Sequence, residues 1–167
     1  RFDNTVTVSR ENAEKIGRVG YAGRASGLSY DARVSFPTEC YGELPANSND
    51  RTDGDVRSRA TVRREEIMHS TRLLQILLEK EEEAHSYIPQ ELQLAPDSLV
   101  VSINEGWRGE VSHCLITDSQ GEILRYKVKD PSFHNWTGLA LSLRDEGISD
   151  FPLCNKSFNL SYCGFDL

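Results

Sequence analysis

This chain of 167 residues has little of what marks several common protein classes. No apolar run approaches the roughly 20 residues that a membrane-spanning helix needs, so any contact with a membrane is expected to be peripheral. The formal net charge is −7 and no basic stripe is present, so no nucleic-acid partner is expected. The chain begins with Arg1 and shows no signal-peptide pattern, which fits a piece of a longer polypeptide.

Cysteine is also scarce, and its four copies are scattered as Cys40, Cys114, Cys154 and Cys163. The spacings match neither a zinc site nor a secreted disulfide scaffold, so reduced cysteines are the better interpretation. Strand-like residues flank Cys114, which predicts a small buried hydrophobic side chain there. Two thiolates without nearby His or Cys partners make a poor metal site, so we expect no metal at Cys154 and Cys163.

The first half of the chain predicts helices joined by loops within one domain, residues 1–167. Ser9 is placed to cap a short helix over 11–16, and the glycine-rich stretch 19–33 is expected to be compact and partly buried. Residues 35–54 lack periodicity and predict a long loop. The longest helix is expected from Val56 to about Glu83, because apolar residues recur there at helical spacing.

The second half carries the β-structure. We expect a strand over 99–103 and a hairpin that joins 110–118 to 122–129. A helix capped by Ser132 and continuing through Leu143 should follow, and a final turn or short helix should carry the tail. The predicted fold class is α+β, with a long helix, further helical segments and a small antiparallel sheet.

The last fourteen residues, Cys154 to Leu167, resemble the C-terminal end of the nickel-iron hydrogenase large subunit and of its relative in complex I, the D-type large subunit. In the hydrogenases this end carries D-P-C-x-x-C, whose cysteines hold nickel. Here Asn159-Leu160 stands at the Asp-Pro, Ser161 at the first cysteine and Gly164 at the second, with Cys163 displaced by one residue. These replacements remove the thiolate ligands, so the tail indicates the fold without the nickel chemistry.

Further motifs extend this resemblance in collinear order over nearly the whole chain. The stretch from Gly20 to Arg33 resembles the R-x-S-G-x-x-x-D-x-R segment that the complex I proteins share with membrane-bound hydrogenases. Residues 105–110 resemble the E-x-P-R-G-E element, although Trp107 replaces the proline. Residues 118–134 resemble the hairpin and the P-x-F that follow. The fold implied is the C-terminal domain of a hydrogenase-like large subunit.

The resemblance implies roles for several residues. Arg108 corresponds to the arginine that lies over the nickel-iron centre in hydrogenases, so it is the first candidate for an active-site residue. It could stabilise developing negative charge or hold an acidic partner, Glu105 or Glu110. A structural ion pair is an equally good interpretation.

A second implied group is a buried charge network that couples redox chemistry to proton movement, formed by Arg24, Asp31 and Arg33 next to the cavity. A static network that holds the fold is the alternative. His134, and also His113, could relay protons near neutral pH, whereas a lone histidine is more often structural.

The resemblance therefore implies a subunit of a membrane-associated oxidoreductase of the NADH-quinone oxidoreductase type, peripheral to the cytoplasmic face of the cell membrane. Its expected partners are a small iron-sulfur subunit, which would hold the cluster, and the membrane-arm subunits. Quinone is the possible cofactor, and the chain itself is expected to hold none and to be inactive alone. The alternatives are a genuine nickel-iron hydrogenase and a structural or assembly subunit without an active cavity.

Overall fold

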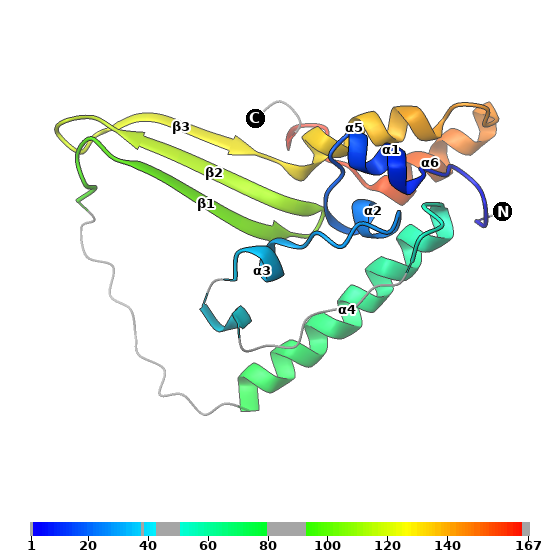
Figure 1. Ribbon diagram of the computed structural model, residues 1–167, viewed down its shortest axis with the longest axis horizontal. Coiled ribbons are helices and arrows are strands. Elements are labelled where there is room, and N and C mark those ends of the chain that lie inside the picture. Colours follow the sequence, from blue (N-terminus) through cyan, green and yellow to red (C-terminus); the bar gives the residue numbers. More distant parts are fainter. Residues whose placement is uncertain (1, 38, 43–50, 80–92, 165–167) are drawn as a thin grey trace.

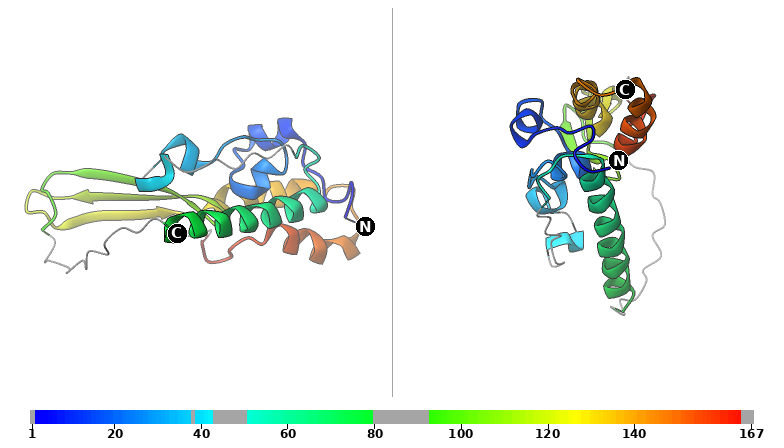
Figure 2. Two further views of the ribbon diagram at one scale, coloured as in Figure 1. Left: turned by 90° about the horizontal axis from the view of Figure 1, so that it is seen from below. Right: turned by 90° about the vertical axis from the view of Figure 1, so that its right-hand side faces the viewer.

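The computed structural model describes residues 2–37, 39–42, 51–79 and 93–164. Helices gather at one end, and a three-stranded antiparallel sheet extends away from them (Figure 1). The long helix α4, Val56–Glu79, diverges from the sheet, and the views in Figure 2 show the sheet reaching well beyond the helices. The predicted α+β class is confirmed. Within the described ranges, no helix is long and apolar enough to cross a membrane.

The N-terminal third forms short helices. Helix α1, Arg10–Lys15, is capped by Ser9, and α2, Gly20–Arg24, is buried along its whole length, as the glycine-rich stretch predicted. Helix α3, Ala32–Ser35, was not predicted, and a 3-10 turn, η1, Glu39–Gly42, interrupts the predicted loop. Residues 43–50 of that loop lie outside the described part of the chain.

Helix α4 begins at Val56 as predicted, because the Asp55 carboxylate accepts the Ser58 N–H at 2.8 Å. Its predicted end near Glu83 lies outside the described residues. The apolar stripe that predicted this helix is largely exposed, with 60% exposure at Leu74 and 83% at Leu78. The buried side of α4 mixes polar and apolar residues, namely Val56, Ser58, Arg59, Val62, Glu66 and Leu73.

The sheet has the order β1-β2-β3, with strands Leu99–Gly106, Gly109–Thr117 and Ile123–Lys129. The predicted hairpin is confirmed, and the first strand runs three residues beyond its predicted end at 103. Cys114 is half-buried, which corrects the prediction of a buried side chain. The reason is that β1 and β3 carry many exposed residues, so the sheet is poorly covered where Cys114 lies.

The C-terminal part contains α5, Pro131–Ser142, then η2, Ile148–Asp150, and α6, Phe151–Phe158. Ser132 was predicted to cap α5, but the cap is Asp130, whose carboxylate accepts the Ser132 N–H at 2.7 Å. Pro131 occupies the first helical position, where its missing N–H costs nothing. The Ser132 hydroxyl accepts the Ser161 N–H at 3.0 Å instead.

The core lies where α2, α4, α5 and α6 meet the N-terminal segment. Phe158 is fully buried, and two arginines stack on its ring, with the guanidinium carbons of Arg18 and Arg59 at 4.9 Å and 4.2 Å from the ring centroid. Arg59 also donates to the carbonyls of Gly54 and Val6. Cation–π contacts and backbone acceptors therefore stabilise charge inside the core and fix α6, which leads into the tail.

Candidate functional site

The site forms where the β1–β2 turn meets the start of α2. Gly106 pairs with Gly109, so only Trp107 and Arg108 lie in the turn. Gly20 has a φ of +65°, and a Cβ there would lie 2.1 Å from the Arg108 carbonyl oxygen. Only glycine allows the two backbones to approach this closely, and the approach brings the base of the hairpin against the N-terminal helices.

Arg24, at the end of α2, is the centre of the site. Its Nε lies 2.7 Å from Glu66 Oε1 on α4, and its Nη1 lies 2.9 Å from Glu105 Oε1 on β1. Asp31, the N-cap of α3, has Oδ2 at 3.5 Å from the same Nη1. All four side chains are at least nine-tenths buried, so a single guanidinium serves three carboxylates that come from three elements.

Arg33 completes the cluster from its outer side. Its Nη2 lies 2.6 Å from Asp31 Oδ2, and its Nε donates to Asp31 Oδ1 at 2.9 Å, which makes a two-pronged ion pair. The structure therefore brings together the predicted residues Arg24, Asp31 and Arg33, together with Glu105 from the other predicted group. Two arginines face three carboxylates, so the Arg24 cluster, defined as Arg24, Asp31, Arg33, Glu66 and Glu105, carries one more negative than positive charge.

The excess negative charge separates the acidic groups by pKa. Burial would raise the pKa of Asp31, but the hydrogen bond from Arg33 and the charges of Arg24 and Arg33 hold it below its ordinary value. Burial raises the pKa of Glu105 and outweighs the attraction of Arg24, with the charge of Asp31 adding to the rise. Burial also opposes the charge of Arg24, but Glu66 and Glu105 hold its pKa above the ordinary value. Glu105 is thus the member of the cluster that accepts a proton most readily.

Glu110 lies directly opposite Glu105 in the β1–β2 ladder. Its carboxylate accepts a hydrogen bond from the Tyr30 hydroxyl, and a second from Ser112 Oγ at 3.0 Å. Burial and this bond to Glu110 raise the pKa of Tyr30, so the phenol keeps its proton. The two glutamates therefore form a cross-strand pair in which one is held by a cation and the other by neutral hydroxyl groups.

Arg108 does not join this cluster. Its Nε donates to the backbone carbonyl of Asn159 at the C-terminal end of α6, and it makes no ion pair with Glu105 or Glu110 in the part of the chain that the structure describes. The contact links the hairpin turn to the tail. The half-buried guanidinium is thereby fixed beside the residues that resemble the hydrogenase metal motif.

The tail positions that correspond to the nickel cysteines form their own hydrogen bonds. Ser161 Oγ accepts the Gly164 N–H at 2.9 Å, and Cys163 Sγ is exposed at 3.6 Å from the same oxygen. Trp136 Nε1 donates to the Ser161 carbonyl at 3.2 Å. Nickel needs several soft thiolates at fixed spacing, and a hydroxyl group and a glycine do not fit this ligand set.

The predicted histidines lie apart from the Arg24 cluster. His134 is half-buried on α5, and burial lowers its pKa, with the charge of Lys129 as the second cause. His113 is on β2, where its Nδ1 lies 2.5 Å from the Tyr126 hydroxyl across the sheet. Among the described residues His134 forms no ion pair with the cluster, and its assignment as a cofactor contact stays a prediction.

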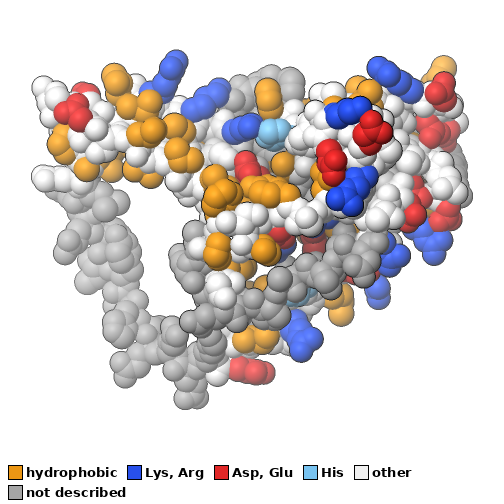
Figure 3. Space-filling model, in the orientation of Figure 1, with side chains coloured by type: hydrophobic (Ala, Val, Ile, Leu, Met, Phe, Trp, Pro, Cys, Tyr) orange, Lys and Arg blue, Asp and Glu red, His pale blue; other side chains and the backbone are white. Residues whose placement is uncertain are grey.

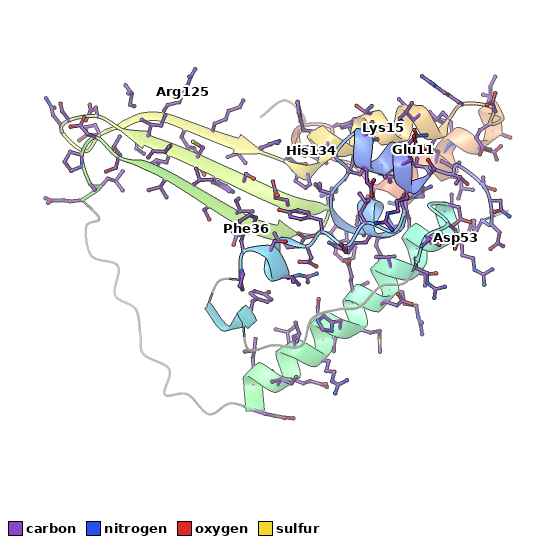
Figure 4. The ribbon with its side chains drawn as sticks, viewed as in Figure 1. Glu11, Lys15, Phe36, Asp53, Arg125 and His134 are labelled. Atoms are coloured by element: carbon purple, nitrogen blue, oxygen red, sulfur yellow. The ribbon has the colours of Figure 1, made fainter. Side chains whose placement is uncertain are left out.

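A small cavity of about 100 Å³ opens beside the cluster. Arg33 and Glu105 line it together with apolar and polar neighbours, namely Ala32, Phe36, Tyr41, Ile103 and Asn104. Phe36 lies beyond α3 toward the space between the sheet and α4 (Figure 4). The cavity therefore places a charged pair next to an aromatic wall.

Sequence comparison connects this arrangement with known proteins. Residues 1–99 match the family described as the 49 kDa subunit of respiratory-chain NADH dehydrogenase. The chain belongs to this 49 kDa subunit family. The predicted resemblance is confirmed.

Individual relatives of the 49 kDa family agree with this assignment. The chain is 30% identical over 165 residues to the D 2 subunit of the NADH-quinone oxidoreductase of Herpetosiphon aurantiacus, which covers 96% of the chain and 45% of the relative. It is 29% identical over 167 residues to formate hydrogenlyase subunit 5 of Escherichia coli, which covers 95% and 28%. The chain thus spans less than half the length of these curated relatives.

A solved structure shows the same fold. The chain superposes with a TM-score of 0.91 on a chain of the membrane-bound sulfane sulfur reductase, an archaeal respiratory membrane complex, at 22% sequence identity. The likeness covers all of this chain and 47% of the other. It supports the predicted C-terminal domain of a 49 kDa-like subunit at the level of the fold.

Two residues of the site were missed by sequence reasoning. Glu66 lies within the charged helix α4, where its neighbours Arg63, Arg64 and Glu65 give it no distinguishing pattern. Tyr30 directly precedes Asp31 in the 49 kDa family segment, and this adjacency was a signal that could have been used. The contact of Glu66 with Arg24 joins residues 42 positions apart, which no local pattern shows.

Proposed function

We propose that this chain is the C-terminal domain of a large subunit in a membrane-associated, energy-converting oxidoreductase of the NADH-quinone oxidoreductase type. The observation that carries the proposal is the buried Arg24 cluster at the base of the hairpin whose turn residue, Arg108, contacts the tail. Family membership and the superposition support a place in such a complex. The work of the domain is electrostatic.

In this proposal Glu105 holds or releases a proton when the charge near the cavity changes. Its carboxylate is buried, its pKa is raised by burial, and the cluster around it is one positive charge short. An electron that reaches an acceptor nearby adds negative charge, which favours protonation of Glu105. Arg108 supplies a fixed cation that stabilises the reduced acceptor. Redox change and proton uptake are then linked through a few ångströms of side-chain contacts.

The proposal includes partners that the domain needs. A small iron-sulfur subunit supplies electrons, a quinone or another carrier accepts them, and membrane-arm subunits use the resulting charge changes. The complex lies at the cytoplasmic face of the cell membrane. The domain works without nickel, because Ser161 and Gly164 replace the thiolates and Ser161 Oγ is engaged by the Gly164 N–H. These replacements argue against the alternative of a genuine nickel-iron hydrogenase.

A structural or assembly role is the second candidate, and a specific observation favours it. The ion pairs of Arg24 connect α2, α3, α4 and β1, and every carboxylate in the cluster has a partner within the chain. Such a network can hold four elements together without any turnover. The two functions therefore differ in whether Arg108 and Glu105 matter for rate.

The discriminating experiment replaces Arg108 in the intact complex. Arg108→Ala removes the cation, and we expect turnover to fall about a hundredfold, the usual effect of losing one stabilising group at a reacting centre. Arg108→Lys keeps the charge and should recover part of the rate. Arg57→Ala is the matched control, because Arg57 forms an exposed pair with Asp3 far from the hairpin. Unchanged turnover of Arg108→Ala in a fully assembled complex would favour the structural role.

A further inference from the structure

One face of the sheet combines apolar strands with a basic edge. Strand register places three rows of residues across it, because alternate residues of a strand point to the same side. The rows are Leu99, Ile116 and Arg125; Val101, Cys114 and Lys127; and Ile103, Ser112 and Lys129. On this face, called the basic-edged face below, β1 and β2 contribute mainly apolar side chains and β3 contributes only cations.

The apolar part of the basic-edged face is open. Leu99 and Val101 are 64% and 56% exposed, and Cys114 and Ile116 are half-buried. Figure 3 shows hydrophobic side chains over the sheet, with Lys and Arg side chains along its upper edge. An exposed apolar surface that is bordered by charge on one side is typical of a contact with another molecule.

The basic edge lacks internal compensation. Arg125, Lys127 and Lys129 form no ion pair with any residue in the described ranges, whereas Arg24, Arg33 and Arg57 do. Side chains two apart on a strand are about 7 Å from each other, so the three cations form a row about 14 Å long. Arg125 projects outward from β3 (Figure 4). A chain with a net charge of −7 therefore keeps an unpaired positive row at this one strand.

We propose that the basic-edged face binds a segment of another polypeptide that has an apolar side and an acidic edge. The apolar side would cover Leu99, Val101 and Ile116, and its carboxylates would meet Arg125, Lys127 and Lys129. Charge complementarity fixes the orientation of such a segment along β3. This surface lies outside the Arg24 cluster, so the proposal does not depend on the redox role.

A protein partner fits better than a membrane surface. The opposite face of the same sheet also exposes apolar residues, with Val100 at 56%, Leu124 at 69% and Tyr126 at 53%. A sheet with two apolar faces cannot lie flat on a bilayer with both of them covered. In addition, the net charge of −7 opposes approach to an anionic membrane.

Carbodiimide cross-linking of the intact complex tests the proposal, because this reagent joins ammonium groups to carboxylates that are in direct contact. The Lys15–Glu11 pair at 2.6 Å, which Figure 4 shows on α1, is the internal control for the reaction. We expect Lys127 and Lys129 to join to Asp or Glu residues of a different polypeptide. Links only within this chain, for example to Glu81 or Glu82, or only between copies of it, would overturn the proposal, as would the absence of links where Lys15 reacts.

A charge reversal supplies the second measurement. Lys127→Glu with Lys129→Glu should lower retention of the cross-linked polypeptide in the purified complex about tenfold or more. Lys127→Gln with Lys129→Gln should lower it less, and circular dichroism should show the sheet retained in both variants. Lys15→Glu should leave retention unchanged. If the reversed variant keeps the polypeptide and instead loses binding to vesicles rich in anionic lipid, the face binds membrane and the proposal fails.

Discussion

Arg24 is the single residue on which most of the buried charge depends. It is 6% exposed and faces Glu66, Glu105 and Asp31. Arg24→Met leaves buried carboxylates without their cation, so we expect a loss of about 3–5 kcal/mol in the free energy of unfolding. Urea denaturation of the purified chain measures it. Arg57→Met removes an exposed pair and should leave stability nearly unchanged; equal losses in the two variants would contradict the central position of Arg24.

Glu105 gives a pH dependence whose sign follows from its raised pKa. The folded-state pKa lies above the ordinary value of 4.5, so below pH 4.5 the proton is bound in both states. As pH rises above 4.5, the unfolded chain loses this proton first, and the stability contributed by protonated Glu105 is lost. Glu105→Gln should therefore gain stability relative to the parent as pH rises through this window. Parallel curves for the two proteins from pH 4 to pH 7 would show that the pKa is not raised.

At the residue scale, the sequence indicated the right kinds of residue and only part of their grouping. Arg24, Asp31, Arg33 and Glu105 were all predicted, because motif resemblance preserves residue identity and order. Glu66 was missed because its contact with Arg24 depends on how α4 crosses α2, which is a tertiary property. Arg108 was predicted to hold an acidic residue and instead donates to the carbonyl of Asn159.

At the scale of elements, the contact between α2 and the hairpin turn decides whether the site forms. Gly20→Ala would put a Cβ 2.1 Å from the Arg108 carbonyl oxygen at a φ of +65°. The left-handed conformation alone costs about 1–2 kcal/mol for a residue with a Cβ, and the clash adds to it. We expect thermal unfolding to show a loss above about 2 kcal/mol. Gly42→Ala is the control, because nothing lies within 4 Å of its Cβ position; similar unfolding of both variants would contradict the close approach.

Local patterns predicted most elements, and tertiary contacts explain the exceptions. The hairpin was predicted because alternating apolar residues flank a turn, and the structure confirms the pairing. Helix α4 was predicted from its apolar stripe, yet the helix buries Arg59 and Glu66 because their partners lie on other elements. The cap of α5 is Asp130 and not Ser132, because the proline between them occupies the first helical position.

At the scale of the whole molecule, surfaces without cover are as informative as the core. The exposed side of α4, with Leu74 and Leu78, and both faces of the sheet expose apolar side chains. The chain spans less than half the length of its curated relatives, and this fits a domain that contacts further polypeptide. No sequence pattern distinguished the buried side of α4 from its open side, because the pattern shows only that a helix has two sides.

The central claim is that this domain serves an oxidoreductase complex through charge and without nickel. The most direct test is nickel analysis of the purified intact complex, together with its rates of electron transfer and of hydrogen turnover. The account predicts electron transfer to a carrier without stoichiometric nickel and without hydrogen turnover. One nickel per complex with hydrogen turnover would contradict it.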